Sequence, residues 1–150
     1  MEKIPVAVAS DHAGYALKEF LKNKLSLAGY AVVDAGTDSA ASCDYPVYAE
    51  AGCRKVLDGE AALCILCCGT GAGMSIAANK MKGIRAACCS DTFTARYIRL
   101  HNDANVLCLG ARVVGEGLAW ELAEAFLTAE FEGGKHARRV GLITKLEENN

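Results

Sequence analysis

Short apolar runs alternate along the chain with segments of helical periodicity, and this alternation limits the possible folds more than any other feature of the sequence. The runs expected to form buried strands are 4–10, 30–36, 61–67, 83–89 and 105–110. Strands that alternate with helices favour a mostly parallel sheet covered by helices on both faces. The predicted fold is therefore α/β, a three-layer α/β/α Rossmann-like domain with a five-stranded parallel sheet.

The segments between these runs carry apolar side chains at helical spacing. In the first of them Leu17, Leu21 and Leu25 mark the buried face, and Lys18 and Lys22 are predicted to lie on the polar face. Helices are expected at 17–28, 44–58, 74–80, 91–101, 115–128 and 136–147. No linker or second core interrupts the pattern, so residues 1–150 are expected to form a single domain.

The charge balance argues against polyanionic partners. The chain has sixteen Lys and Arg residues and eighteen Asp and Glu residues, which gives a net charge of −2. A nucleic-acid or anionic-membrane surface needs a basic excess, so neither partner is expected. The first residues lack a signal-peptide pattern and no apolar stretch is long enough to span a membrane, which predicts a cytoplasmic protein.

Eight cysteines are numerous for a chain of 150 residues. Thiols stay reduced in the cytoplasm, so most of these cysteines are interpreted as small buried apolar side chains. The spacing of Cys64 and Cys67 superficially resembles a zinc motif. On a strand, however, these two side chains point to opposite faces, and the prediction is that the cysteines hold no metal.

The most informative segment is the glycine loop, Cys68–Gly73, which directly follows the third predicted strand. Its three glycines, Gly69, Gly71 and Gly73, allow backbone amides to approach an oxyanion where a helix begins. A tight strand-to-helix turn is the simpler interpretation, but such a turn seldom needs three glycines. The loop lacks a Walker A lysine, the spacing of a dinucleotide fingerprint, and the arginine of a cysteine phosphatase.

Several polar residues follow the predicted strands. Asp11 and His12 come after the first, Cys68 ends the third, and Arg112 follows the fifth. The carboxyl ends of parallel strands share one edge of a sheet, where ligands of such folds bind. The loop amides favour the thiolate form of Cys68, which makes it a candidate base or nucleophile.

Two further groups of residues have alternative interpretations. His101 and Asn102 end a predicted helix, so His101 is either an acid-base group or an ordinary helix terminator. Lys135, Arg139 and the neighbouring basic residues begin the last predicted helix, where they could bind an anion or form a solvated face.

Taken together, six segments carry a family resemblance. They are SDHAG (10–14), DYP (44–46), CGTGAGMSIAANK (68–80), GIRAA (83–87), LHNDANVLCLGARVVG (100–115) and EGGKHARRV (132–140). In order and spacing they closely resemble the ribose-5-phosphate isomerase B family, within the wider group that includes galactose-6-phosphate isomerase subunits.

The resemblance implies interconversion of ribose 5-phosphate and ribulose 5-phosphate through an enediolate, without a metal or organic cofactor. It implies that Cys68 is the base, that Thr70 and the amides of Gly69 to Gly73 steady the enediolate, and that His101 and Asp11 open the sugar ring. The substrate-binding residues that it implies are Asp11, His12, Tyr45, Gly69, Thr70, Gly71, Ala72, Gly73, Asn102, Arg112, Lys135 and Arg139. Lys135 stands where the family often has an arginine, and it keeps the charge without the planar fork.

The resemblance also implies a homodimer or homotetramer whose active sites combine residues from two subunits. Two alternatives stay open. One is an isomerase of a six-carbon sugar phosphate, such as allose 6-phosphate or galactose 6-phosphate. The other is a sensor that binds sugar phosphate without catalysis, and such a sensor would not need a thiol beside the glycine loop.

Overall fold

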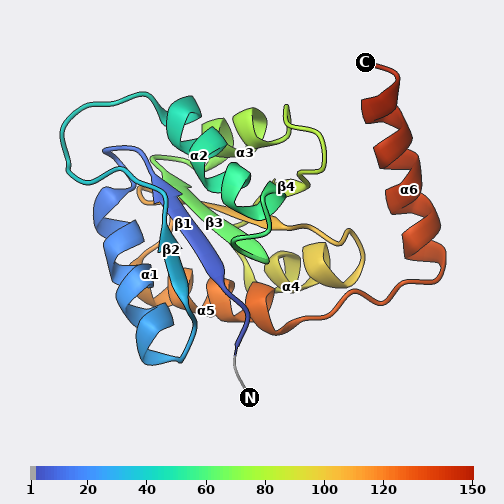
Figure 1. Ribbon diagram of the computed structural model, residues 1–150. Helices are drawn as coiled ribbons and strands as arrows, with labels where there is room; N and C mark the ends of the chain where they lie inside the picture. Colours follow the sequence, from blue (N-terminus) through green and yellow to red (C-terminus); the bar gives the residue numbers. More distant parts are fainter. Residues whose placement is uncertain (1–2) are drawn as a thin grey trace.

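A five-stranded parallel sheet forms the centre of the computed structural model, which describes residues 3–150 (Figure 1). Its strands are β1 (Val6–Ser10), β2 (Val32–Asp34), β3 (Leu63–Cys68), β4 (Ala86–Cys88) and β5 (Val106–Gly110). They lie in the order β2-β1-β3-β5-β4. The chain leaves β1 toward one side of the sheet and leaves β3 toward the other. The carboxyl ends of β1 and β3 therefore flank the crevice where ligands of such sheets bind.

Helices cover both faces of the sheet, which confirms the predicted three-layer fold. The apolar faces of α1 (Tyr15–Leu27), α4 (Thr92–Leu100) and α5 (Glu116–Thr128) share one core cluster with the sheet. On the other face, α2 (Tyr45–Leu57) and α3 (Ala72–Ala78) contribute to the second cluster. None of the helices within residues 3–150 is long and apolar enough to cross a membrane.

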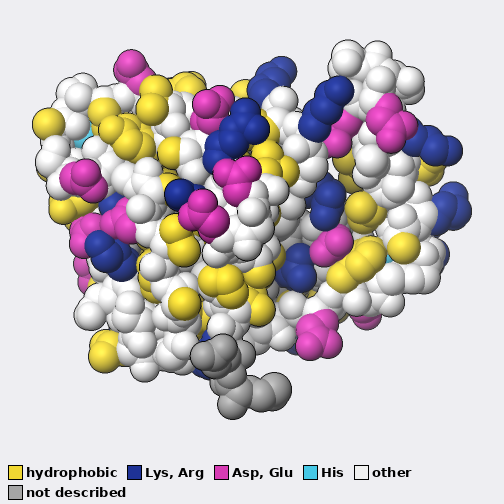
Figure 2. All heavy atoms as spheres, in the orientation of Figure 1, with side chains coloured by type: hydrophobic (Ala, Val, Ile, Leu, Met, Phe, Trp, Pro, Cys, Tyr) yellow, Lys and Arg dark blue, Asp and Glu magenta, His cyan; other side chains and the backbone are white. Residues whose placement is uncertain are grey.

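The last helix, α6 (Lys135–Glu148), differs from the others because none of its residues is buried. It stands beside the three layers at the end of an extended segment (Figure 1). Figure 2 shows a hollow, with Lys and Arg side chains along it, between much of α6 and the rest of the molecule, and near the end of α6 Glu147 accepts the Gly83 amide at 3.2 Å. Leu142, Ile143 and Leu146 of α6 are exposed. This chain alone thus leaves an amphipathic helix largely uncovered.

The side chains of β3 alternate between the two cores. Cys67 packs in the cluster with α1 and α5, whereas Cys64 packs in the cluster with α2 and α3. The prediction that Cys64 and Cys67 face opposite sides is therefore confirmed. Six of the eight cysteines are buried, and burial raises the pKa of Cys53 and of Cys89 to about 12. These two thiols stay neutral and pack as apolar side chains.

The element boundaries differ from the predicted ones mainly at the sheet edges. Only three residues of each of the runs 30–36 and 83–89 form a strand, and these strands are β2 and β4. Each is an edge strand that pairs with a single neighbouring strand. The helix predicted at 74–80 begins earlier, at Ala72, because Gly71 takes a left-handed conformation (φ 82°) and serves as its N-cap.

The prediction that Lys18 lies on a polar, solvent-facing side of its helix is wrong. Lys18 is fully buried, and its Nζ donates to Asp34 Oδ1 at 2.9 Å and to the Thr37 carbonyl at 2.6 Å. Lys22, one turn later, binds Asp34 Oδ2 at 2.9 Å from the surface. Helical spacing placed Lys18 beside Lys22, but the loop after β2 closes over the first of these two lysines.

Candidate functional site

Three predicted site residues meet at the carboxyl edge of the sheet. Cys68 is the last residue of β3, Asp11 directly follows β1, and Arg112 lies two residues after β5. These strands are neighbours, and the Asp11 amide donates to the Cys67 carbonyl at 3.3 Å. The parallel register therefore gathers residues that are far apart in the sequence, as the strand-end argument predicted.

The glycine loop turns back over the end of β3. The Gly71 amide donates to Cys68 Sγ at 3.1 Å, and the Ala72 amide donates to Thr70 Oγ1 at 3.3 Å. A Cβ at Gly71 would lie 2.7 Å from Cys88 Sγ. The loop thus packs closely over the carboxyl end of β5 and against Cys88 of β4, with the Cys68 sulfur turned toward its amides.

Two side chains from other elements lie against this loop. The Tyr45 ring, at the start of α2, packs so closely on Gly73 that a Cβ there would lie 2.6 Å from a ring carbon. The Arg112 guanidinium lies over Gly69, where a Cβ would be 2.9 Å from Nη1, and the Arg112 amide donates to the Gly69 carbonyl at 3.0 Å. A phenol and a guanidinium therefore flank the Cys68 loop.

Asp11 and His12 are held by backbone contacts. Asp11 is 6% exposed, and its Oδ1 accepts the Gly14 amide at 3.0 Å. His12 Nδ1 accepts the Cys43 amide at 3.2 Å. In a neutral imidazole one nitrogen accepts and the other donates, so this bond assigns the proton to Nε2. His12 thereby offers a donor at this edge.

The remaining predicted residues lie elsewhere in the chain. His101 is the C-cap of α4, and Asn102 lines a hollow with Arg85 and Ala104, which precede β4 and β5. This is the amino edge of the sheet, opposite the edge that holds Cys68. Lys135 and Arg139 belong to α6. Within one chain, these four predicted residues are separated from the Cys68 loop.

His101 has close partners of its own. Its Nε2 lies 2.9 Å from Glu132 Oε1, and its ring stacks on that of His136 with centroids 4.0 Å apart. Desolvation, together with the neighbouring His101, lowers the pKa of His136. Sequence reasoning missed Glu132, because it lies before both the predicted helix and α6, and no local periodicity links it to His101.

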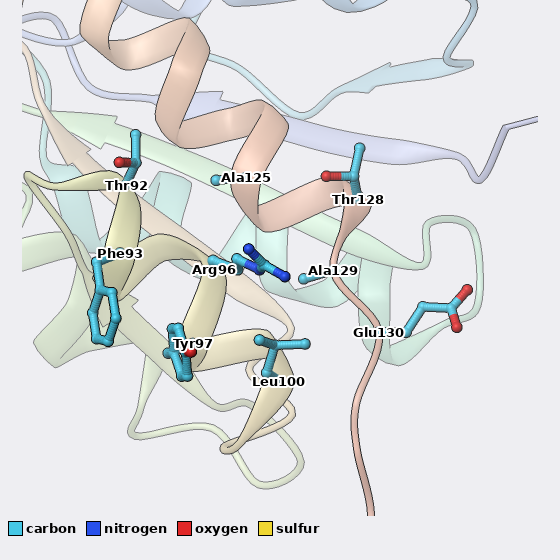
Figure 3. A pocket seen from close by; sticks show the side chains of 9 residues that line it. All are labelled: Thr92, Phe93, Arg96, Tyr97, Leu100, Ala125, Thr128, Ala129 and Glu130. Carbon is cyan, nitrogen blue, oxygen red and sulfur yellow. The ribbon is translucent and has the colours of Figure 1, made fainter.

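A separate hollow of about 860 Å³ lies between α4 and α5 (Figure 3). Phe93 and Tyr97 stack along α4 at its rim, with centroids 4.2 Å apart, and Arg96 projects into it. No residue that lines it was predicted for the site, and it lies within the helix layer rather than at the strand ends. We therefore locate the candidate site at the Cys68 loop.

Comparison with known proteins gives consistent results. The family model described as Ribose/Galactose Isomerase matches residues 6–143. Ribose-5-phosphate isomerase B of Escherichia coli is 47% identical over 95% of this chain and 96% of its own length. The structure of Clostridium thermocellum ribose-5-phosphate isomerase B superposes with a TM-score of 0.96, at 47% identity, and the match covers 97% of this chain and 99% of that one. The Mycoplasma genitalium enzyme with bound ribulose 5-phosphate matches with a TM-score of 0.92 at 40% identity, covering 97% of each chain.

Proposed function

Because this chain belongs to the ribose/galactose isomerase family, we propose that it interconverts D-ribose 5-phosphate and D-ribulose 5-phosphate through an enediolate. The observation that carries the proposal is the Cys68 thiol at the end of β3, held at 3.1 Å from the Gly71 amide. Aldose-ketose interconversion needs a base beside a carbonyl and donors for the oxygen that becomes negative. The Cys68 loop offers both within a few residues.

Cys68 acts as the general base in this proposal. Its thiolate takes the proton from C2 of the open-chain aldose, the electron pair forms the C1–C2 double bond, and the carbonyl oxygen O1 takes up the negative charge. A proton then passes from O2 to O1 and Cys68 returns its proton to C1, which leaves the carbonyl group at C2 of the ketose. The hydrogen bond that the Gly71 amide donates to Cys68 Sγ stabilises the negative charge of the thiolate before it takes the proton. The other thiols on β3, Cys64 and Cys67, are fully packed in the two cores, and burial raises the pKa of each.

The enediolate oxygen would be stabilised by the Thr70 hydroxyl and by the amides of the segment from Gly69 to Gly73. Donors fixed by the backbone need no reorganisation as charge develops, and this is why such contacts commonly supply the largest catalytic contribution. Asp11, fixed by Gly14 at the adjacent strand end, would bind sugar hydroxyls and assist ring opening. Tyr45, seated on Gly73, would close the side of the pocket.

His101 and Asn102 would reach this site from a second copy of the chain. A five-residue parallel strand is about 16 Å long, and proton transfer requires contact or one bridging water. His101 lies at the amino edge of its own sheet, so it is too far from its own Cys68 to open the same ring. A homodimer or homotetramer with sites shared between copies is therefore part of the proposal.

The phosphate would be bound by cations from both copies. His12 and Arg112 lie at the carboxyl edge beside the Cys68 loop, and Lys135 and Arg139 of α6 would come from the partner. The exposed apolar residues of α6 support this arrangement, because a helix with no buried residue gains a core by docking on a second copy. The cytoplasm is proposed as the compartment, in keeping with the many buried free thiols.

The test is steady-state isomerisation of ribose 5-phosphate, allose 6-phosphate and galactose 6-phosphate by the wild-type protein and by Cys68→Ala, with binding of each sugar phosphate measured in parallel. We expect the pentose to react fastest and Cys68→Ala to bind it without turnover. A matched control is Cys53→Ala, which removes a buried thiol on α2 outside the site. Preferred turnover of a hexose phosphate would reassign the substrate. Binding without turnover by the wild-type protein would support the sensor instead.

A further inference from the structure

At the C-terminal end of α4, away from the Cys68 loop of the same chain, three potential metal ligands converge. They are His101 Nε2, Glu132 Oε1 and a ring nitrogen of His136, and the three ligand atoms all lie within 4.8 Å of one another. We propose that His101, Glu132 and His136 form a binding site for one late first-row divalent ion, for which Zn²⁺ is the probe, and that this ion inhibits the enzyme.

The backbone holds these three residues together. The Glu132 amide donates to the Leu100 carbonyl at 3.0 Å, so Glu132 is fixed beside the C-terminus of α4, where His101 is the cap. Gly133 and Gly134 then adopt positive φ values of 69° and 58°. This turn starts α6 and brings His136 back over Glu132, and the His136 amide is bonded to the Gly133 carbonyl at 3.1 Å. The cluster therefore rests on main-chain geometry from two segments.

The distances fit a tetrahedral ion. Zn²⁺ lies about 2.1 Å from nitrogen and oxygen ligands, so neighbouring ligand atoms in a tetrahedron are roughly 3.4 Å apart. Glu132 Oε1 lies 2.9 Å from His101 Nε2 and 3.7 Å from His136 Nε2, which brackets this value. The rings of His101 and His136 are stacked, 9° from parallel, so both imidazoles must turn for their lone pairs to converge on one ion. Glu132 is about half exposed and can shift with them.

The donor set indicates the class of ion. Two imidazoles with one carboxylate suit Zn²⁺, Co²⁺, Ni²⁺ or Cu²⁺, whereas Mg²⁺ and Ca²⁺ prefer oxygen ligands alone. Glu132 is about half exposed, so a water molecule can fill the fourth position. Three protein ligands with one open position make an exchangeable site rather than a closed structural one.

Inhibition follows from the identity of one ligand. An imidazole nitrogen bound to a metal can neither accept nor deliver a proton, so an ion on His101 removes the group proposed for ring opening. This consequence rests on the proposed function, whereas the metal site itself does not. Binding of the metal is therefore measured independently of turnover.

The direct experiment is calorimetric titration of the full-length protein, first stripped with EDTA, with Zn²⁺ in a phosphate-free buffer. We expect one site per chain, and we expect Glu132→Gln and His136→Ala each to weaken its affinity at least tenfold. The matched control is Glu130→Gln, which removes a carboxylate two residues away from Glu132. A second control, Cys88→Ser, removes the exposed thiol that could also bind Zn²⁺.

A footprint on the wild-type protein gives a readout that does not depend on variants. The chain has three histidines, so acylation by diethyl pyrocarbonate can be mapped on each of them by mass spectrometry. Zn²⁺ should protect His101 and His136 and leave His12 reactive. The proposal is overturned if the protein binds no Zn²⁺ at 100-fold molar excess, if Cys88→Ser alone abolishes binding, or if His101 and His136 stay unprotected. Neither readout requires isomerase activity, so both test the metal site even if the proposed function is wrong.

Discussion

Mixing two inactive variants, Cys68→Ala and His101→Ala, should restore part of the activity. The reason is that the two residues occupy opposite edges of the same sheet, about one strand length of 16 Å apart. Within its own chain His101 contacts Glu132 at 2.9 Å instead. A productive site therefore combines Cys68 of one copy with His101 of another.

The size of the recovery follows from counting sites. In a heterodimer of the two variants, one site receives both substitutions and the other site receives neither. Random pairing at equal concentrations makes about half of the dimers heterodimers, each with one intact site of two, so the mixture should recover about a quarter of the wild-type activity per chain. Sites confined to single chains would give no recovery, because every site would carry one substitution.

The assay needs exchange of subunits. The two variants would be co-expressed with different affinity tags, or mixed after reversible dissociation, and the fraction of heterodimer would be determined by native mass spectrometry. The reference mixture is Cys68→Ala with Cys68→Ser, which can form heterodimers but no site with an intact Cys68. Abundant heterodimers with no more activity than this reference would refute the shared site.

Three further predictions concern stability. Lys18→Met should lower the unfolding free energy by about 2–3 kcal/mol, because it leaves the buried Thr37 carbonyl without a donor and removes one partner of the Asp34 carboxylate. Lys22→Met removes the surface partner of the same carboxylate and should lower the unfolding free energy by less than about 1 kcal/mol. Urea titrations at fixed protein concentration would measure both, and equal losses would contradict the role of burial. Desolvation opposes ionisation of Asp34, but hydrogen bonds from Lys18, from the Gly36 amide and from Lys22 outweigh it and hold the pKa of this carboxyl below its usual value. The carboxylate therefore stabilises the fold above pH 3.8 and loses that contribution as the pH falls through the lowered pKa. Acid titrations monitored by circular dichroism should show a weaker pH dependence below pH 4 for Lys18→Met than for the wild type, and an unchanged slope would argue against the pair. Gly14→Ala should destabilise the protein by about 1–3 kcal/mol, because its Cβ would overlap the Cys67 carbonyl, and a wild-type urea midpoint would contradict that contact.

Local sequence pattern was sufficient to predict the strands and helices, and to predict which edge of the sheet holds the Cys68 loop. The apolar runs around β1, β3 and β5 have the length and composition of buried strands, and these signals lie within a few residues of each other. The positions of Asp11, Cys68 and Arg112 follow from the topological rule for parallel sheets, so their convergence was predictable without coordinates. The glycines of the loop were informative because the backbone conformation and close packing at Gly71 leave no room for a side chain.

Contacts between distant segments were decided by the tertiary structure alone. Lys18 and Lys22 are one turn apart on α1 and look equivalent in the sequence, yet only Lys18 is enclosed by the loop that follows β2. His101 and Glu132 are thirty-one residues apart in the sequence. They are brought together by the main-chain hydrogen bond from the Glu132 amide to the Leu100 carbonyl.

The physical reason is the range of the interactions involved. Helical and strand periodicity record which side of a segment meets a core, and neighbouring residues carry that information. Which charge is buried, and which imidazole meets which carboxylate, depends on how whole elements pack, and no single segment encodes that. The sequence by itself thus determined the α/β fold and the thiol at the strand end, whereas packing alone enclosed Lys18 and brought His101 against Glu132.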